Sequence, residues 1–150
     1  MDPQNLGSIL RTAYFLGTDG VLLCTRDSAP LSSTVAKASS GALELVTLYE
    51  TTAPLKTLLA CQAQGWQIIG TLLSNTSTPL SALPSLTRPT ILVMGSEGEG
   101  LRSSLIPLCD TLVHLPQATA ANATLVDSLN VSVATGIFLQ QLLNSRTTDQ

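Results

Sequence analysis

The chain has 150 residues, the length of one ordinary domain, and ten acidic against seven basic residues give it a net charge of −3. This balance argues against a free-standing nucleic-acid binder, which usually carries a basic patch. Charged residues make up 11% of the chain, about half the roughly 25% typical of soluble domains, so we expect part of the surface to be covered by another chain. No apolar run approaches the roughly 18–20 residues of a membrane span. A membrane-spanning segment is therefore not expected. The three cysteines are widely spaced and form no CxxC pair, so neither a disulfide framework nor a metal site is expected.

Hydrophobic periodicity, glycines and prolines divide the chain into alternating helices and strands. The predicted elements are a helix over 5–16, a strand over 20–24, a helix over 32–38, a strand over 43–48, a helix over 55–64, a strand over 67–73, a loop over 74–89, a strand over 90–94, a short helix from 101, a strand over 111–115, a loop over 116–127 and a helix over 128–144. This alternation predicts an α/β fold with a mainly parallel sheet and helices on both faces.

The first segment that could carry functional residues is Asp2–Ala13, which reads DPQNLGSILRTA. Its polar head can cap the predicted helix, and Arg11 lies one helical turn beyond Gly7 and Ser8. Taken alone, the segment is better explained as a capped helix with a surface arginine.

The second segment is Leu92–Leu101, where a strand runs into the glycine-rich sequence GSEGEG. Open parallel sheets bind ligands at the carboxyl ends of their strands, where glycine allows close backbone approach. The order of glycines matches neither the dinucleotide fingerprint nor a phosphate-binding loop, and two glutamates would repel a pyrophosphate. We therefore expect a ligand with a neutral or cationic face, although a mobile turn is the simpler alternative.

The third segment is Ser128–Gly136, which reads SLNVSVATG. A helix that begins here offers backbone N–H groups, hydroxyls and an amide to a ligand, and its small residues permit close packing. A well-capped C-terminal helix at a tight interface is the alternative.

Together the three segments closely resemble the three motifs of the TrmH/SpoU family of RNA ribose 2′-O-methyltransferases, in the same order and at similar separations over nearly the whole chain. The family patterns are D-P-x-N-x-G-x-x-x-R-T/S-A, G-x-E-G-x-G-L/M and S-L-N-V-S-x-A. Within the family, Asp2–Leu16 and Pro30–Glu44 are most similar to mitochondrial large-subunit rRNA guanosine-2′-O-methyltransferases.

The resemblance implies a SPOUT fold with a deep C-terminal trefoil knot, a homodimer, S-adenosylmethionine as cofactor and RNA as substrate. The cofactor contacts it implies are Thr71, Leu72, Met94, Gly95, Gly100, Leu115, Leu129, Asn130 and Ala134. The catalytic residues it implies are Asn5, Arg11, Glu97, Ser128 and Asn130.

The implied roles differ among these residues. Arg11 has been regarded as a general base in the family, but a guanidinium stays protonated in proteins, so we expect it to hold the phosphate and the developing oxyanion. Asn5 would orient the ribose or Arg11, Glu97 would position Arg11, and Ser128 with Asn130 would fix substrate and loop geometry. We expect His114 to be a structural histidine rather than a catalytic one.

The chain departs from the family pattern in three places. A strand that usually precedes the first motif and an upstream RNA-binding domain are expected but are not in this sequence, and the loop over 116–128 is longer than usual.

Two other functions stay open: methylation of tRNA, and a non-catalytic ribosome-assembly factor or partner subunit with the same fold. The mitochondrial resemblance predicts the mitochondrial matrix, with the cytoplasm as alternative.

Overall fold

Parallel strands form two sheets in the structure, a computed structural model that describes residues 1–96, 100–117 and 128–145. In the smaller sheet β1 (Val21–Cys24) pairs with β2 (Leu48–Thr51). The larger sheet has the order β4-β6-β3-β5, and every pairing in both sheets is parallel. Its strands are β4 (Thr78–Pro79), β6 (Thr111–His114), β3 (Gln67–Thr71) and β5 (Thr90–Val93). The predicted α/β class with parallel pairing is confirmed.

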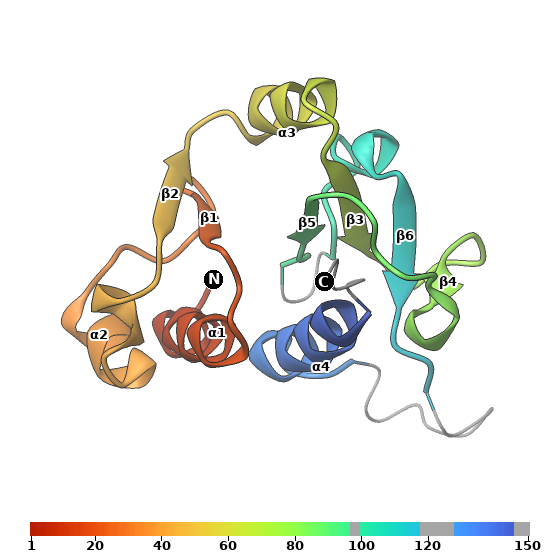
Figure 1. Cartoon of the computed structure of the whole chain (residues 1–150). Coiled ribbons are helices and arrows are strands. Elements are labelled where there is room, and N and C mark those ends of the chain that lie inside the picture. The colour runs from red at the N-terminus through yellow and green to blue at the C-terminus, as the bar shows by residue number, and fades with distance from the viewer. Residues whose placement is uncertain (97–99, 118–127, 146–150) are drawn as a thin grey trace.

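Helices cover both faces of the larger sheet, as predicted. The helices are α1 (Pro3–Leu16), α2 (Ser33–Ser39), α3 (Pro54–Ala63) and α4 (Val131–Asn144). Ile69 packs with Phe138 of α4 on one face, whereas the next residue, Ile68, packs with Leu58 of α3 on the other. Successive side chains of a strand point to opposite faces, so β3 is buried from both sides. The helix α1 packs against both α2 and α4 (Figure 1).

The division into two sheets differs from the single sheet that the alternating pattern predicts. In Figure 1 the outer edge of β1 faces the outer edge of β5, and no strand is drawn between them. Among the described residues neither edge has a strand partner. The two sheets are joined at their carboxyl ends by an ion pair between Asp27, which follows β1, and Arg102, which follows the glycine loop.

Two predicted elements are wrong. The apolar run over 43–48 begins with the short 3₁₀ helix η1 (Ala42–Glu44), and the strand starts only at Leu48. Ser40 and Gly41 have positive φ angles of 50° and 89° and turn the chain, so that Leu43 and Val46 pack three residues apart on the cluster around α1. The short helix predicted from Leu101 is a turn followed by η3 (Ile106–Leu108), which contains Pro107.

Other differences concern element boundaries. The helix α1 begins two residues earlier than predicted, because Asp2 accepts hydrogen bonds from the amides of Gln4 and Asn5 and Pro3 occupies the first turn. The helix α4 begins at Val131 instead of Ser128. The loop over 74–89 contains β4 and the 3₁₀ turn η2 (Leu80–Ala82). The predicted trefoil knot depends on the path of 118–127, which lies outside the described residues.

The glycine of the first motif lies where α1 and α2 cross. A Cβ atom on Gly7 would lie 2.5 Å from the Cβ of Ala38 and 2.8 Å from the carbonyl oxygen of Val35. Gly7 is buried and Val35 is fully buried, so the two helices approach through this position. The glycine is therefore explained by packing, without a direct part in chemistry.

We expect Gly7→Ala to lower the free energy of unfolding by about 2 kcal/mol, because the added methyl group overpacks two helix backbones. Urea unfolding followed by circular dichroism measures the change. Gln4→Ala, an exposed substitution in the same helix, serves as control and should change stability by less than about 0.5 kcal/mol. Equal stability of the two variants would contradict the close crossing.

Candidate functional site

The carboxyl ends of β5, β3 and β6 lie side by side, with β3 in the middle. Thr71 and Leu72 lie at the end of β3, Met94 and Gly95 follow β5, and Leu115 follows β6. Met94 and Leu115, together with Ala134 of α4, pack against the same buried cluster. The structure thus brings together the predicted cofactor residues from three strands and from α4.

The glycine-rich loop has a paired stem. Ser96 and Gly100 exchange two backbone hydrogen bonds of 2.9 and 3.0 Å. A Cβ atom on Gly95 would lie 2.5 Å from the carbonyl carbon of Gly100 and 2.7 Å from the nitrogen of Leu101. Gly95 is therefore required because the returning backbone passes against it. Gly100 has a φ angle of 69°, and Glu97 lies outside the described residues.

The third motif caps α4 and contacts the first motif. The side-chain oxygen of Asn130 accepts hydrogen bonds from the amide of Ser132 at 2.9 Å and from the Ser132 hydroxyl at 2.6 Å. It also accepts a longer bond from the amide of Val133. The side-chain nitrogen of Asn130 donates to Oδ1 of Asn5 at 3.0 Å. Two predicted catalytic residues, 125 positions apart, are thus hydrogen-bonded. The predicted site residues Ser128 and Leu129 are exposed and directly precede Asn130.

Two substitutions separate the roles of Asn130. Asn130→Ala should cost about 1 kcal/mol of stability, because α4 loses its N-cap. Asn130→Asp keeps an acceptor at a helix N-terminus, which favours a negative charge, but a carboxylate cannot donate to Asn5. We therefore expect the aspartate variant to have the same free energy of unfolding as the parent chain. Its rate of methyl transfer should fall at least about tenfold. A loss of stability equal to that of the alanine variant, or full activity, would contradict this division of roles.

Arg11 lies apart from this pair. Its Nη1 donates to the hydroxyl of Ser40, the C-cap residue of α2, at 3.0 Å. Arg11 also lines a shallow hollow between α1 and α4, together with Thr12, Phe15, Leu16, Gly136 and Gln140.

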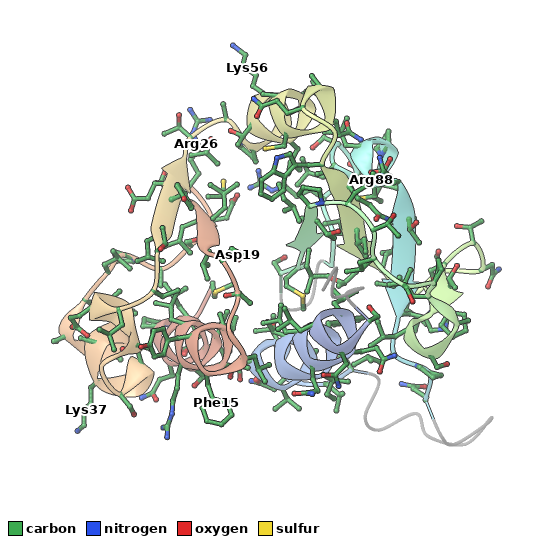
Figure 2. All side chains as sticks on the ribbon, viewed as in Figure 1. Phe15, Asp19, Arg26, Lys37, Lys56 and Arg88 are labelled. Atoms are coloured by element: carbon green, nitrogen blue, oxygen red, sulfur yellow. The ribbon has the colours of Figure 1, made fainter. Side chains whose placement is uncertain are left out.

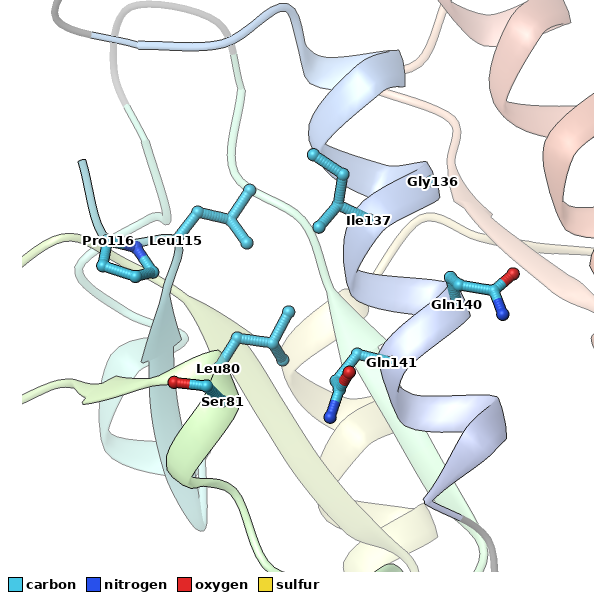
Figure 3. Close-up of a pocket in the computed structure, with 8 residues that line it drawn as sticks. All are labelled: Leu80, Ser81, Leu115, Pro116, Gly136, Ile137, Gln140 and Gln141. Atoms are coloured by element: carbon cyan, nitrogen blue, oxygen red, sulfur yellow. The ribbon is translucent and has the colours of Figure 1, made fainter. Parts of the chain in front are cut away.

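A second hollow, of about 530 Å³, lies on the other side of α4 (Figure 3). Leu80, Leu115 and Ile137 surround it, and Ser81, Pro116, Gly136, Gln140 and Gln141 complete its lining. Leu115, a predicted cofactor contact, belongs to this lining. The hollow is mostly apolar and extends the cluster on which Met94 and Ala134 pack.

The titratable groups near the site have structural explanations. His114 Nδ1 lies 2.8 Å from the hydroxyl of Ser77, a pairing that suits the predicted structural histidine. Burial raises the pKa of Cys109, and burial together with a hydrogen bond to Asp27 raises the pKa of Cys24. Both thiols are therefore protonated near neutral pH and are poor nucleophiles.

Residues 1–96, 100–117 and 128–145 contain no group of three or more metal-ligating side chains and no helix long and apolar enough to cross a membrane.

Three hydroxyl groups around the site escaped prediction. Ser132 supports the Asn130 side chain, Ser40 holds Arg11, and Ser77 holds His114. Ser132 belongs to the third motif, where a serine two residues after an N-cap asparagine could have suggested the contact. Nothing in the local sequence pattern links Ser40 to Arg11, which is 29 positions away.

The chain matches known proteins over nearly all of its length. The model of the SpoU rRNA Methylase family matches residues 1–140. A curated relative, the 23S rRNA (guanosine-2′-O-)-methyltransferase RlmB of Pseudomonas aeruginosa, is 42% identical over 146 residues, which cover 97% of this chain and 56% of that protein. The mitochondrial rRNA methyltransferase 1 of Schizosaccharomyces pombe is 41% identical over 150 residues, which cover 95% of this chain and 48% of that protein.

Solved structures share the fold. An rRNA methyltransferase from Sinorhizobium meliloti, solved with AdoMet bound, superposes with a TM-score of 0.81 at 30% identity and covers 95% of this chain and 52% of that one. The chain spans about half the length of these relatives or less.

Proposed function

Because the chain belongs to the SpoU rRNA methylase family, we propose that it transfers a methyl group from S-adenosylmethionine to the 2′-hydroxyl of a guanosine in large-subunit rRNA. The observation that carries this proposal is the meeting of three strand ends, the stem of the glycine loop and the start of α4. The names of the bacterial and mitochondrial relatives support a guanosine of large-subunit rRNA as the target.

The residues at the strand ends suit this cofactor. Leu72, Met94, Leu115 and Ala134 are apolar and half-buried, and the loop stem presents backbone groups without a basic side chain. Such a lining suits an uncharged purine and a sulfonium better than a phosphate. When bound, the cofactor supplies an electrophilic methyl group on positive sulfur.

The chain's polar residues would hold the substrate. The bond between Asn130 and Asn5 fixes both amides beside the start of α4, where they can orient a ribose. The guanidinium of Arg11 carries five N–H donors and stays protonated, so it can clamp a phosphate and a developing oxyanion but cannot remove a proton. Ser128 lies two residues before Asn130 and would add a hydroxyl contact, and Glu97 would position Arg11.

The assay for this function is methyl transfer to a large-subunit rRNA fragment. Digestion of the product should leave a nuclease-resistant dinucleotide that contains 2′-O-methylguanosine. Methylation of a base, or of tRNA in preference to rRNA, would contradict the proposal. Absence of any transfer at saturating RNA, with intact cofactor binding, would favour a non-catalytic partner subunit.

We further propose that two copies associate through the face formed by α1 and α4. Phe15 is 85% exposed and points away from α1 (Figure 2). On α4, Val133 and Ile137 are 51% and 42% exposed and lie one turn apart. Arg11 lines the hollow between the two helices, so a second copy on this face would lie against a catalytic residue. A patch that combines a protruding ring with a hollow suits a symmetric contact.

Phe15→Glu should convert the dimer into a monomer, because it would bury a charge in an apolar contact. Sedimentation velocity measures the oligomeric state. Leu45→Glu, at an exposed leucine outside α1 and α4, is the matched control and should leave the dimer intact. A dimer in both variants would move the interface elsewhere.

We also propose that the longer protein supplies a strand, from residues before Met1, between β1 and β5. Three of the four β5 residues are aliphatic, and each of the four is only half-buried, as expected of a strand that lacks a neighbour. The amino group of Met1 donates to the carbonyl oxygen of Asp27, beyond the carboxyl end of β1. A parallel strand between β1 and β5 would end near this point and lead into α1.

Extending the chain at its N-terminus tests the added strand. Amide exchange in β1 and β5 should become slower, because both edges gain backbone partners. Unchanged exchange in these two strands would contradict the proposal.

We also propose that an upstream domain binds the RNA and that the protein is mitochondrial. The acidic balance of this chain fits a catalytic half whose RNA affinity comes from an upstream domain, so we expect weak RNA binding by these residues alone. Mitochondrial relatives from four organisms support a mitochondrial location. Fluorescence of the tagged full-length protein tests the location.

A further inference from the structure

The strand β3 holds its neighbour β5 beyond the end of their backbone pairing. The register of the two strands runs from Gln67 opposite Thr90 to Gly70 opposite Val93. The next residue, Thr71, continues the link with its side chain. Its hydroxyl donates to the carbonyl oxygen of Val93 at 3.3 Å and accepts from the amide of Gly95 at 3.2 Å.

A second contact fixes the other side of the same stem. Leu101 is 5% exposed, and one of its methyl carbons would lie 2.7 Å from a Cβ atom on Gly70, the residue before Thr71. The absence of a side chain at Gly70 lets Leu101 pack directly over β3. The outgoing and returning arms of the stem are thus attached to adjacent residues of one buried strand.

We infer that Thr71 is a positioning residue, which sets the glycine loop for the cofactor through its hydroxyl group instead of binding the cofactor itself. The inference rests on the proposed function. The single donor hydrogen of the hydroxyl and one of its two acceptor lone pairs are used within the chain, so the hydroxyl has no hydrogen left to donate to the cofactor. The amide of Gly95 donates to the Thr71 side chain and not to the backbone of a neighbouring strand. This bond fixes the position of Gly95 and so preorganises the loop stem.

Thr71→Val and Thr71→Ser test the inference. Valine keeps the β-branched shape and removes the hydroxyl, whereas serine keeps the hydroxyl. Thr90→Val is the matched control, because Thr90 lies at the opposite end of β5 and its hydroxyl bonds only a nearby backbone carbonyl, that of Arg88. Two quantities are measured: the exchange rate of the Gly95 amide by nuclear magnetic resonance without cofactor, and the dissociation constant for S-adenosylmethionine by calorimetry.

We expect Thr71→Val to accelerate Gly95 exchange and to weaken cofactor binding, each by about five- to tenfold, the loss expected for one net hydrogen bond. Thr71→Ser and Thr90→Val should stay within about twofold of the parent in both quantities, and the melting temperature of Thr71→Val should fall by no more than about 4 °C. Exchange at Gly95 unchanged by valine would overturn the inference. So would accelerated exchange with unchanged affinity, or an equal loss in the serine variant.

Failure of the proposed function gives a different result. In that case the parent chain does not bind S-adenosylmethionine, and the claim that Thr71 serves the cofactor fails with it. Accelerated Gly95 exchange in Thr71→Val alone would then still show that the hydroxyl holds the loop stem.

Discussion

Replacing Arg11 by alanine is expected to lower single-turnover methyl transfer by about 100- to 1000-fold, the loss typical of removing one donor to a developing oxyanion. The dissociation constant for S-adenosylmethionine should stay unchanged, because Arg11 lies on α1 and is not among the residues at the strand ends and on α4 that we propose to hold the cofactor; its guanidinium bonds Ser40. Stability should change by less than about 1 kcal/mol, since the bond to Ser40 is exposed. Rapid-quench transfer at saturating cofactor and RNA measures the chemical step.

Arg11→Lys distinguishes a clamp from a point charge. Lysine keeps the positive charge but loses the planar fork, so we expect a loss of about tenfold or more. Arg88→Ala is the matched control, because Arg88 lies before the amino end of β5, away from the strand ends that form the site. Near-normal turnover by the lysine variant would contradict bidentate binding, and an equal effect of Arg88→Ala would indicate general electrostatics.

The second large effect is expected for Gly95→Ala. The new methyl group would lie between 2.5 and 2.8 Å from three backbone atoms of Gly100 and Leu101, none of which can rotate away. We expect the free energy of unfolding to fall by about 2 kcal/mol and cofactor affinity to fall at least about tenfold, because the stem must open. Calorimetry and urea unfolding measure the two quantities.

Ser96→Ala is the control for this substitution. Ser96 is exposed, and its hydroxyl makes a long contact of 3.5 Å with the carbonyl oxygen of Gly100, while its backbone pairing is independent of the side chain. Affinity and stability should both stay close to those of the parent chain. A Gly95→Ala variant with parental affinity would show that the closed stem is not needed for binding.

Much of the fold follows from local signals in the sequence. Asp2 and Pro3 begin α1, Gly17 ends it in a left-handed conformation, and Gly65 has a positive φ angle just after α3. Apolar runs identify β1, β3, β5 and β6 within one or two residues at either end. These signals depend on backbone conformation and burial of nearby residues, which a short window of sequence contains.

The predictions are wrong where contacts between residues distant in the sequence determine the structure. Leu43 and Val46 look like strand residues, but they pack around α1 after the turn at Ser40 and Gly41. The site was predicted as a set of residues from family motifs, whereas the bond between Asn130 and Asn5 and the contact of Arg11 with Ser40 depend on how helices pack. Periodicity carries no information about such pairings.

The most direct test of the central claim is a calorimetric titration of the chain with S-adenosylmethionine. We expect saturable binding of about one cofactor per chain, weakened by Gly95→Ala and unaffected by Arg11→Ala. Absence of binding by a folded chain, even after the proposed preceding strand is added, would contradict a cofactor site at the ends of β3, β5 and β6.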